Sequence, residues 1–181
     1  MLNRQTASSI EAIYRFFVRK GFWGQQYIPC LELDPQMEGR KEYSLSAREY
    51  GRALKALFDL WFQDRMEARA VRIRQFENYV EMLRGADPEA CAMYGRCSMQ
   101  NVIEADGTIY PCDFFATDPF QMGNIRDEGI DFRRLAAIGE RDDKNPFFQE
   151  MDRRDDRCRQ CRWYPLCRGG CKRDCRKREG G

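Results

Sequence analysis

Histidine is absent from the 181-residue sequence, and so are a strong net charge and long apolar runs. Without histidine, the chain has no histidine general base, no mixed cysteine–histidine zinc finger and no histidine-ligated iron. No run of 18 or more apolar residues occurs, so we expect no membrane-spanning helix. The net charge of +2 is too small to indicate nucleic-acid binding by itself. Residues 1–6 carry no secretory signal pattern, so we expect a cytoplasmic protein with reduced thiols.

Cysteine, in contrast, is abundant and unevenly distributed. Eight of the nine cysteines lie between residues 91 and 181, and only Cys30 stands apart. A small packing role is the commoner reading of Cys30, and a place in a site is the other. Cysteine clusters in a reducing compartment usually bind metal, and eight thiolates would serve two four-cysteine centres. These eight are Cys91, Cys97, Cys112, Cys158, Cys161, Cys167, Cys171 and Cys175.

Three kinds of site compete for these thiols. Zinc would suit the pair Cys158-x2-Cys161, but two zinc ribbons normally need two such pairs each, and the sequence has one. Disulfides fit poorly with a reducing compartment and an odd cysteine count. Iron–sulfur clusters fit best, because they take four cysteines from a tight run and let a later cysteine ligate another cluster. On the residues alone, zinc and disulfides stay open.

Residues 1–85 alternate between helical and strand patterns. The boxes Ser8-x-x-Glu11 and Ser46-x-x-Glu49 predict capped helix starts, and the second helix would run to about residue 66. Short strands are predicted at 25–29 and 70–73, and a short helix ends at Gly85. This alternation predicts an α/β arrangement with parallel strands, part of a barrel or an open sheet. A change in composition after residue 85 sets a boundary between regions 1–85 and 86–181.

The cysteine-rich region is expected to be a small α+β domain. Ala105-Asp106-Gly107 separates two strand-like runs, which predicts a β-hairpin. Cys97 and Cys112 lie just outside its two ends, so the hairpin would bring both thiols to one centre. Between the cysteine groups we expect a short strand or turn at 121–125 and short helices at 131–137 and 146–151.

The segment from residue 153 to 178 is strongly basic. It holds eleven Lys or Arg residues and three Asp. A solvated basic face is the simplest reading, and an offset to anionic iron–sulfur clusters is the second. Nucleic-acid contact is the third, and no interleaved aromatic residues of RNA-binding type support it.

The cysteine spacing resembles that of a known domain. Cys97-x9-Gly107-x4-Cys112 followed by Cys158-x2-Cys161-x5-Cys167-x3-Cys171 is similar to the SPASM domain, which binds auxiliary clusters in peptide-modifying radical SAM enzymes. Cys91 and Asp113 stand where anaerobic sulfatase-maturating enzymes carry an extra cysteine and an aspartate. Further segments that resemble this family are Tyr14-Arg15-Phe16-Phe17, Gln26-Tyr27-Ile28-Pro29, Gly123-Asn124-Ile125 and Gly169-Gly170-Cys171.

The resemblance implies an incomplete C-terminal part of a radical SAM barrel at 1–85 and a SPASM domain at 86–181. It implies two 4Fe–4S clusters. Cluster I would be held by Cys91, Cys97, Cys112 and Cys171, and cluster II by Cys158, Cys161, Cys167 and Cys175. Cys175 follows Cys171 after only three residues, whereas the family's last ligand lies well downstream.

The resemblance also implies a role for Asp113. It would be the general base that deprotonates a sulfatase Cys or Ser, which the family oxidises to formylglycine. A carboxylate beside a thiolate ligand feels negative charge, which should raise its pKa and suit it as a base. The implied partner is therefore a sulfatase polypeptide of Cys or Ser type.

One family motif is missing. The sequence contains no Cys-x3-Cys-x2-Cys, the motif that holds the cluster that cleaves S-adenosylmethionine. We therefore expect a fragment that is inactive alone, with S-adenosylmethionine a cofactor only in a full-length form, and enzyme status stays open. The alternative is a non-catalytic iron–sulfur or zinc module for peptide or partner recognition, or an electron-transfer module with a redox partner. We expect no nucleic-acid or membrane partner.

Overall fold

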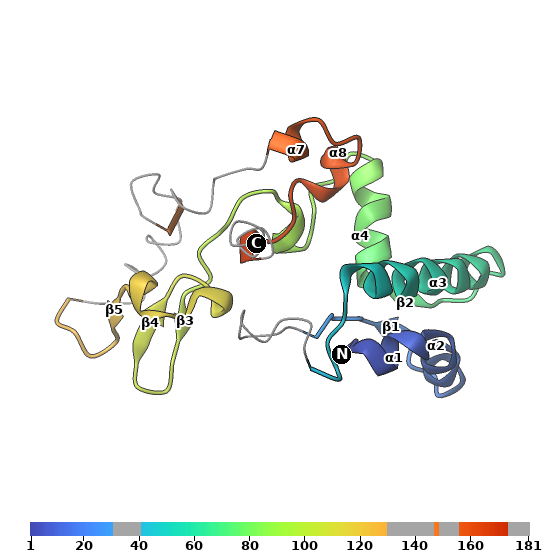
Figure 1. The fold of residues 1–181 in the computed structure, drawn as a ribbon, viewed down its shortest axis with the longest axis horizontal. Coiled ribbons are helices and arrows are strands. Elements are labelled where there is room, and N and C mark those ends of the chain that lie inside the picture. Colours follow the sequence, from blue (N-terminus) through green and yellow to red (C-terminus); the bar gives the residue numbers. More distant parts are fainter. Residues whose placement is uncertain (31–40, 130–146, 149–155, 174–181) are drawn as a thin grey trace. The chain divides into compact units, whose positions relative to one another are not determined.

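The computed structural model describes residues 1–30, 41–129, 147–148 and 156–173. The chain forms two compact units, Met1–Ala86 and Asp87–Gly181, and each is described by itself. Figure 1 follows their elements along the chain. None of the helices within the described ranges has the length and apolar character needed to cross a membrane.

The N-terminal unit packs helices around two short parallel strands. Its helices are α1 (Arg4–Ser8), α2 (Ile10–Arg19), α3 (Ala47–Met66) and α4 (Arg74–Leu83). The strands β1 (Gly24–Gln25) and β2 (Arg72–Ile73) pair in parallel, with Gly24 opposite Arg72. Leu2 and Pro29 add an isolated parallel bridge. The alternation of helices and parallel strands is present, with strands shorter than the sequence pattern predicts.

One of the two predicted capping boxes is confirmed. The Ser46 hydroxyl accepts a hydrogen bond from the Glu49 amide at 3.2 Å, and the Glu49 carboxylate accepts one from the Ser46 amide at 2.9 Å. These bonds satisfy amides that the first turn of α3 leaves without partners.

The other box, at Ser8, is wrong. Asn3 caps α1 by accepting from the Thr6 amide at 2.8 Å, and α2 begins after Ser9 without a side-chain cap. Ser8 is the last residue of α1, and its hydroxyl donates to the Gln5 carbonyl at 2.7 Å. A serine inside a helix commonly bonds back to a preceding carbonyl, which removes it from capping the next helix.

A hydrogen-bonded carboxylate lies within the core of this unit. Asp64 accepts from the Tyr14 hydroxyl and from the Arg69 guanidinium, each at 2.8 Å. These bonds compensate for the burial of the Asp64 charge. The Trp61 indole donates to the Val71 carbonyl at 3.2 Å and ties α3 to the start of β2. The buried apolar residues of this core are Leu2, Ala7, Ile10, Tyr14, Tyr27, Ala53, Leu57, Trp61, Val71, Ile73 and Phe76.

The C-terminal unit contains the predicted hairpin. Strands β3 (Val102–Ile103) and β4 (Thr108–Tyr110) are antiparallel, and β5 (Gly123–Asn124) extends the sheet beside β4, as Figure 1 shows. Gly107 has φ +89°, and a Cβ there would lie 2.8 Å from the Asn124 amide oxygen. The turn therefore requires glycine for both its backbone angle and its close neighbour.

Short helices make up the remaining described elements of this unit. They are η2 (Cys91–Met93), η3 (Asp113–Phe115), η4 (Asp118–Phe120), α7 (Asp156–Arg159) and α8 (Tyr164–Cys167). Of the short strand or turn expected at 121–125, the strand is present as β5. The helices predicted at 131–137 and 146–151 lie outside the described residues, except for Phe147 and Phe148, which are helical.

Candidate metal centre

The hairpin fixes the chain beside Cys97 and Cys112. The Gln100 amide donates to the Pro111 carbonyl at 2.7 Å, three residues after Cys97 and one before Cys112. The two segments that carry these thiols are therefore held side by side at the open end of the hairpin. Cys91 begins η2, and its thiol makes a polar contact with the Ser98 hydroxyl at 3.9 Å.

Cys97 shares one electrostatic environment with three other cysteines. Its pKa is raised to about 12, first by burial and then by Cys91, Cys171 and Cys112, while Lys172 acts in the opposite direction. Each of these thiols is thus close enough to Cys97 to affect its ionisation. The structure brings together the four cysteines assigned to cluster I, which come from segments up to 80 residues apart.

Aromatic side chains exclude water from part of this group. Phe115 and Phe120 meet edge to face at a centroid distance of 5.4 Å, and Phe147 lies 5.7 Å from Phe115. Cys97 and Cys112 pack against this cluster, which Phe148 completes. Burial is the main reason that the pKa of Cys112 is also raised to about 12. An apolar shell of this kind limits solvent access to a metal site and influences its redox potential.

A close backbone approach brings the Cys171 segment to the same place. Gly95 has φ +73°, and a Cβ there would lie 2.7 Å from both the Cβ and the carbonyl oxygen of Arg168. Gly95 lies two residues before Cys97, and Arg168 lies three before Cys171. Only a glycine lets these two loops approach so closely, so Gly95 helps to unite the two ends of the cysteine pattern.

Asp113 lies at the edge of this group. Its side chain is on the surface, at the start of η3, and its Oδ1 accepts from the Phe114 amide at 3.0 Å. The same oxygen accepts from the Cys112 thiol at 3.3 Å. An oriented carboxylate that solvent reaches, next to a thiol, can accept a proton from a molecule that approaches this face.

The second group of cysteines is built differently. Cys158 is half-buried in α7, whereas Cys161 and Cys167 are exposed. The Cys161 amide donates to the Cys158 carbonyl at 3.2 Å, and the Cys167 amide donates to the Trp163 carbonyl at 2.9 Å. These bonds are local turns, so the spacing of the three thiols is set by one short segment. The assigned fourth ligand, Cys175, lies outside the described residues.

In the described ranges, no three cysteine or acidic side chains are close enough together to hold a single metal ion. A 4Fe–4S cluster spaces its four thiolates around a larger core than one ion does. Four cysteine thiols in a shared, partly apolar environment are the donor set that such a cluster takes. The residues of the cluster I site therefore fit a 4Fe–4S cluster.

Cys30 belongs to the N-terminal unit, where its amide donates to the Leu2 carbonyl at 2.6 Å.

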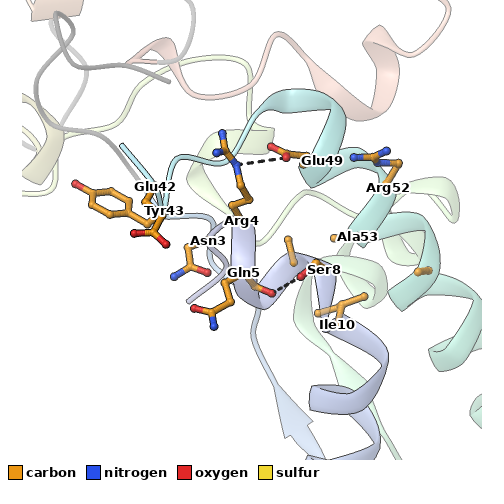
Figure 2. A pocket seen from close by; sticks show the side chains of 12 residues that line it. Asn3, Arg4, Gln5, Ser8, Ile10, Glu42, Tyr43, Glu49, Arg52 and Ala53 are labelled. Carbon is orange, nitrogen blue, oxygen red and sulfur yellow. Dashed lines mark hydrogen bonds and ion pairs between the residues drawn. The ribbon is translucent and has the colours of Figure 1, made fainter. Parts of the chain in front are cut away.

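A pocket of about 840 Å³ opens on the N-terminal unit beside α1 and α3 (Figure 2). The Arg4 guanidinium and the Glu49 carboxylate form an ion pair at 3.4 Å along its wall. Its remaining lining is mixed, with Ser8, Tyr43 and Arg52 among the polar members. None of the predicted site residues lines it.

Comparison with known proteins agrees with the geometry of the C-terminal unit. Residues 91–162 match the SPASM family, described as an iron–sulfur cluster-binding domain. The chain resembles the C-terminal half of anaerobic sulfatase-maturating enzymes. The cysteine-type enzyme of Clostridium novyi (strain NT) is 40% identical over 176 residues, which cover 96% of this chain and 45% of that protein. The chain thus spans a little under half the length of this relative.

Solved structures give the same likeness. Native anSMEcpe with bound AdoMet superposes with a TM-score of 0.87 at 33% identity, over 99% of this chain and 48% of that one. The same protein with bound AdoMet and the Cp18Cys peptide also gives a TM-score of 0.87. The fold of this chain therefore corresponds to about half of a sulfatase-maturating enzyme.

Sequence reasoning missed Gly95 and the aromatic cluster, and it did not single out Lys172 within the basic segment 153–178. Phe114-Phe115 and Phe147-Phe148 are paired aromatics in a polar region, and their composition could have indicated an apolar shield. Gly95 gave no comparable signal, because its role depends on a contact between distant loops, and the burial of Lys172 is likewise not visible in the sequence.

Proposed function

We propose that the chain binds two 4Fe–4S clusters and is the auxiliary-cluster portion of an anaerobic sulfatase-maturating enzyme. In this proposal, residues 1–85 are the last units of a radical SAM barrel and residues 86–181 are the SPASM domain. The observation that carries it is the shared environment of four cysteines, three of which lie in the segment that matches a cluster-binding family. A cytoplasmic location, where the thiols stay reduced, is part of the proposal.

Each of the two groups of cysteines is proposed to supply the ligands of one cluster. Cys91, Cys97, Cys112 and Cys171 would hold cluster I. The second group would supply Cys158, Cys161 and Cys167 to cluster II, with Cys175 as the fourth ligand. When bound, the clusters supply an electron acceptor for the oxidation of the substrate side chain.

Asp113 is proposed to take the proton of the target residue. Its carboxylate is accessible and is oriented by the Phe114 amide, so a Cys or Ser side chain of a sulfatase peptide could approach it. The Cp18Cys peptide bound to the solved relative supports a peptide as the substrate class. The Clostridium novyi relative is a cysteine-type enzyme, which favours a cysteine target.

The base role can be tested in a full-length form that supplies Cys-x3-Cys-x2-Cys. Asp113→Asn keeps the side-chain shape and removes the basic oxygen, so formylglycine formation should fall by about a hundredfold or more. Asp118→Asn, an exposed aspartate of the neighbouring η4, is the matched control and should have little effect. An Asp113→Asn enzyme with full activity and normal iron content would exclude this role.

Cluster binding is tested on the chain itself by anaerobic reconstitution. We expect about eight irons and as many sulfides per chain, because each centre takes four of each. About two zinc ions per chain, with no brown absorbance, would instead support the alternative of a zinc-bound recognition module. The chain should release no 5′-deoxyadenosine from S-adenosylmethionine, since it lacks the motif for that reaction. Reversible reduction with a protein partner, without peptide binding, would favour an electron-transfer module.

A further inference from the structure

Lys172 is a buried cation next to a proposed cluster ligand. It directly follows Cys171, and only 4% of its surface is exposed. Lysine is almost never buried to this degree unless an opposite charge compensates it. Within the part of the chain that the structure describes, no Asp or Glu forms an ion pair with it. The Lys172 ammonium therefore needs a negative charge from another source to compensate its burial.

The surroundings of Lys172 point to the cluster I site. Lys172 adjoins Cys171 in the chain, and the loop just before them, at Arg168, approaches Gly95, two residues before Cys97. The Lys172 Nζ lies 3.7 Å from the position that a Cβ on Gly169 would occupy, which places the ammonium at the Gly169 loop. Because Lys172 is buried, solvent screens its charge less than it would on the surface.

We propose that Lys172 is the internal counter-cation of the cluster I site and raises the reduction potential of the cluster bound there. This inference rests on the proposed function. A cluster held by four thiolates is negatively charged, and reduction adds one more negative charge. A fixed positive charge nearby therefore stabilises the reduced form more than the oxidised form. The more easily reduced cluster is the better electron acceptor.

The other described cations of the basic segment are placed differently. Arg162 is exposed and lies over the Trp163 ring at 4.6 Å. Arg173 is half-buried, and its guanidinium lies over the Phe114 ring at 4.3 Å. An exposed charge is screened by water and salt and has a small effect on a buried site. Among the cations of this segment that the structure describes, Lys172 is the most fully buried, so we expect it to act most strongly on the cluster.

The test uses a chain that retains only the cluster I site, with Cys158, Cys161 and Cys167 all replaced by serine. Lys172→Met removes the charge and keeps most of the side-chain length, and Lys172→Arg keeps the charge. Lys55→Met, the same change at an exposed position of α3, is the control. Each protein is reconstituted anaerobically and its midpoint potential is measured by a redox titration followed by electron paramagnetic resonance.

We expect Lys172→Met to lower the equilibrium constant for one-electron reduction about tenfold, a shift of about 59 mV to more negative potential. Lys172→Arg should stay within about threefold of the parent, which corresponds to about half that shift, and Lys55→Met should not change the potential. An unchanged midpoint in Lys172→Met would overturn the inference. If Lys172→Met fails to bind iron while Lys172→Arg binds it, the charge requirement is supported.

Two further outcomes separate this inference from the proposed function. If neither Lys172 variant binds iron but the parent does, the shape of lysine matters rather than its charge, and the inference is wrong while cluster binding stands. If the parent binds no iron although it is folded, the proposed function fails, and the inference fails with it.

Discussion

The two groups of cysteines in the C-terminal unit are assembled differently, although each has an exposed member, Cys91 in the first and Cys161 in the second. The cluster I site collects thiols from distant segments, shields Cys97 and Cys112 with phenylalanines, and places a buried lysine beside them. The described part of the second group is one continuous segment, with Cys161 and Cys167 exposed and their spacing set by local turns. The first group therefore depends on tertiary structure, and the second depends mainly on its own sequence.

This difference has a functional meaning. A shielded site with an internal cation can hold a cluster at a defined potential, because water and salt have limited access to it. An exposed site leaves its ligands open to solvent and to exchange. We therefore expect the two groups to differ in reactivity, in their dependence on distant contacts and in the consequence of a single substitution.

The largest expected effect is the loss of one cluster. Cys97→Ser removes a ligand of the first group, and Cys161→Ser removes one of the second. Each should reduce bound iron from about eight to about four per chain, since a 4Fe–4S centre normally needs all four cysteines. The Cys30→Ser protein, which is changed in the N-terminal unit, should retain all of its bound iron. Iron analysis after reconstitution measures this, and a Cys97→Ser protein with undiminished iron would remove Cys97 from the ligand set.

The next effect is a difference in thiol reactivity in the reduced, metal-free chain. The thiolate is the nucleophile, and a pKa raised to about 12 by burial leaves Cys97 almost entirely protonated at pH 8. Cys161 and Cys167, which solvent reaches directly, should be alkylated by iodoacetamide about a hundredfold faster than Cys97 and Cys112. Because the pKa of Cys97 is raised, its rate should keep increasing as the pH rises toward 12.

Mass spectrometry of each cysteine peptide at several times gives these alkylation rates. Unfolding the chain in urea is the control, because it should make the rates similar. Equal rates for all these cysteines in the folded, metal-free chain would mean that the first group is not shielded.

A smaller effect concerns the contact that unites the first group. Gly95→Ala places a Cβ 2.7 Å from Arg168 in addition to the strain of its positive φ, whereas Gly170→Ala, at φ +70°, meets nothing within 4 Å. We expect Gly170→Ala to lower the free energy of unfolding by about 1 kcal/mol. Gly95→Ala should lower it by about 2 kcal/mol more, because only this substitution also overpacks the contact. Urea titration of the reconstituted chain, followed by cluster absorbance, measures the difference. Equal costs would show that the loop approach at Gly95 does not support the site.

Local patterns predicted the local structure well. The Ser46 capping box opens α3 as expected, and Asp106-Gly107 forms the turn of the hairpin. The Ser8 box failed because an earlier cap at Asn3 starts α1, which places Ser8 inside a helix. Strands β1 and β2 are shorter than their apolar patterns, since parallel pairing depends on neighbouring strands and not on propensity alone.

In the candidate site, too, local sequence patterns predict some features and contacts between distant residues determine the others. The spacing of Cys97, Gly107 and Cys112 predicts a hairpin with thiols at both ends, because a hairpin returns the chain to its start. The burial of Lys172 and the approach of Gly95 to Arg168 join residues far apart in sequence, and no local pattern encodes them. Cys175 and the connecting residues 130–146 and 149–155 lie outside the described structure, so the ligand role of Cys175 stays a prediction.

The most direct measurement is the iron and sulfide content of the chain with Cys158, Cys161 and Cys167 replaced by serine. If Cys91, Cys97, Cys112 and Cys171 form a complete site, this protein should bind about four irons and four sulfides. Its spectrum should be that of a 4Fe–4S cluster. A folded protein that binds no iron, or binds a single zinc ion instead, would contradict the account.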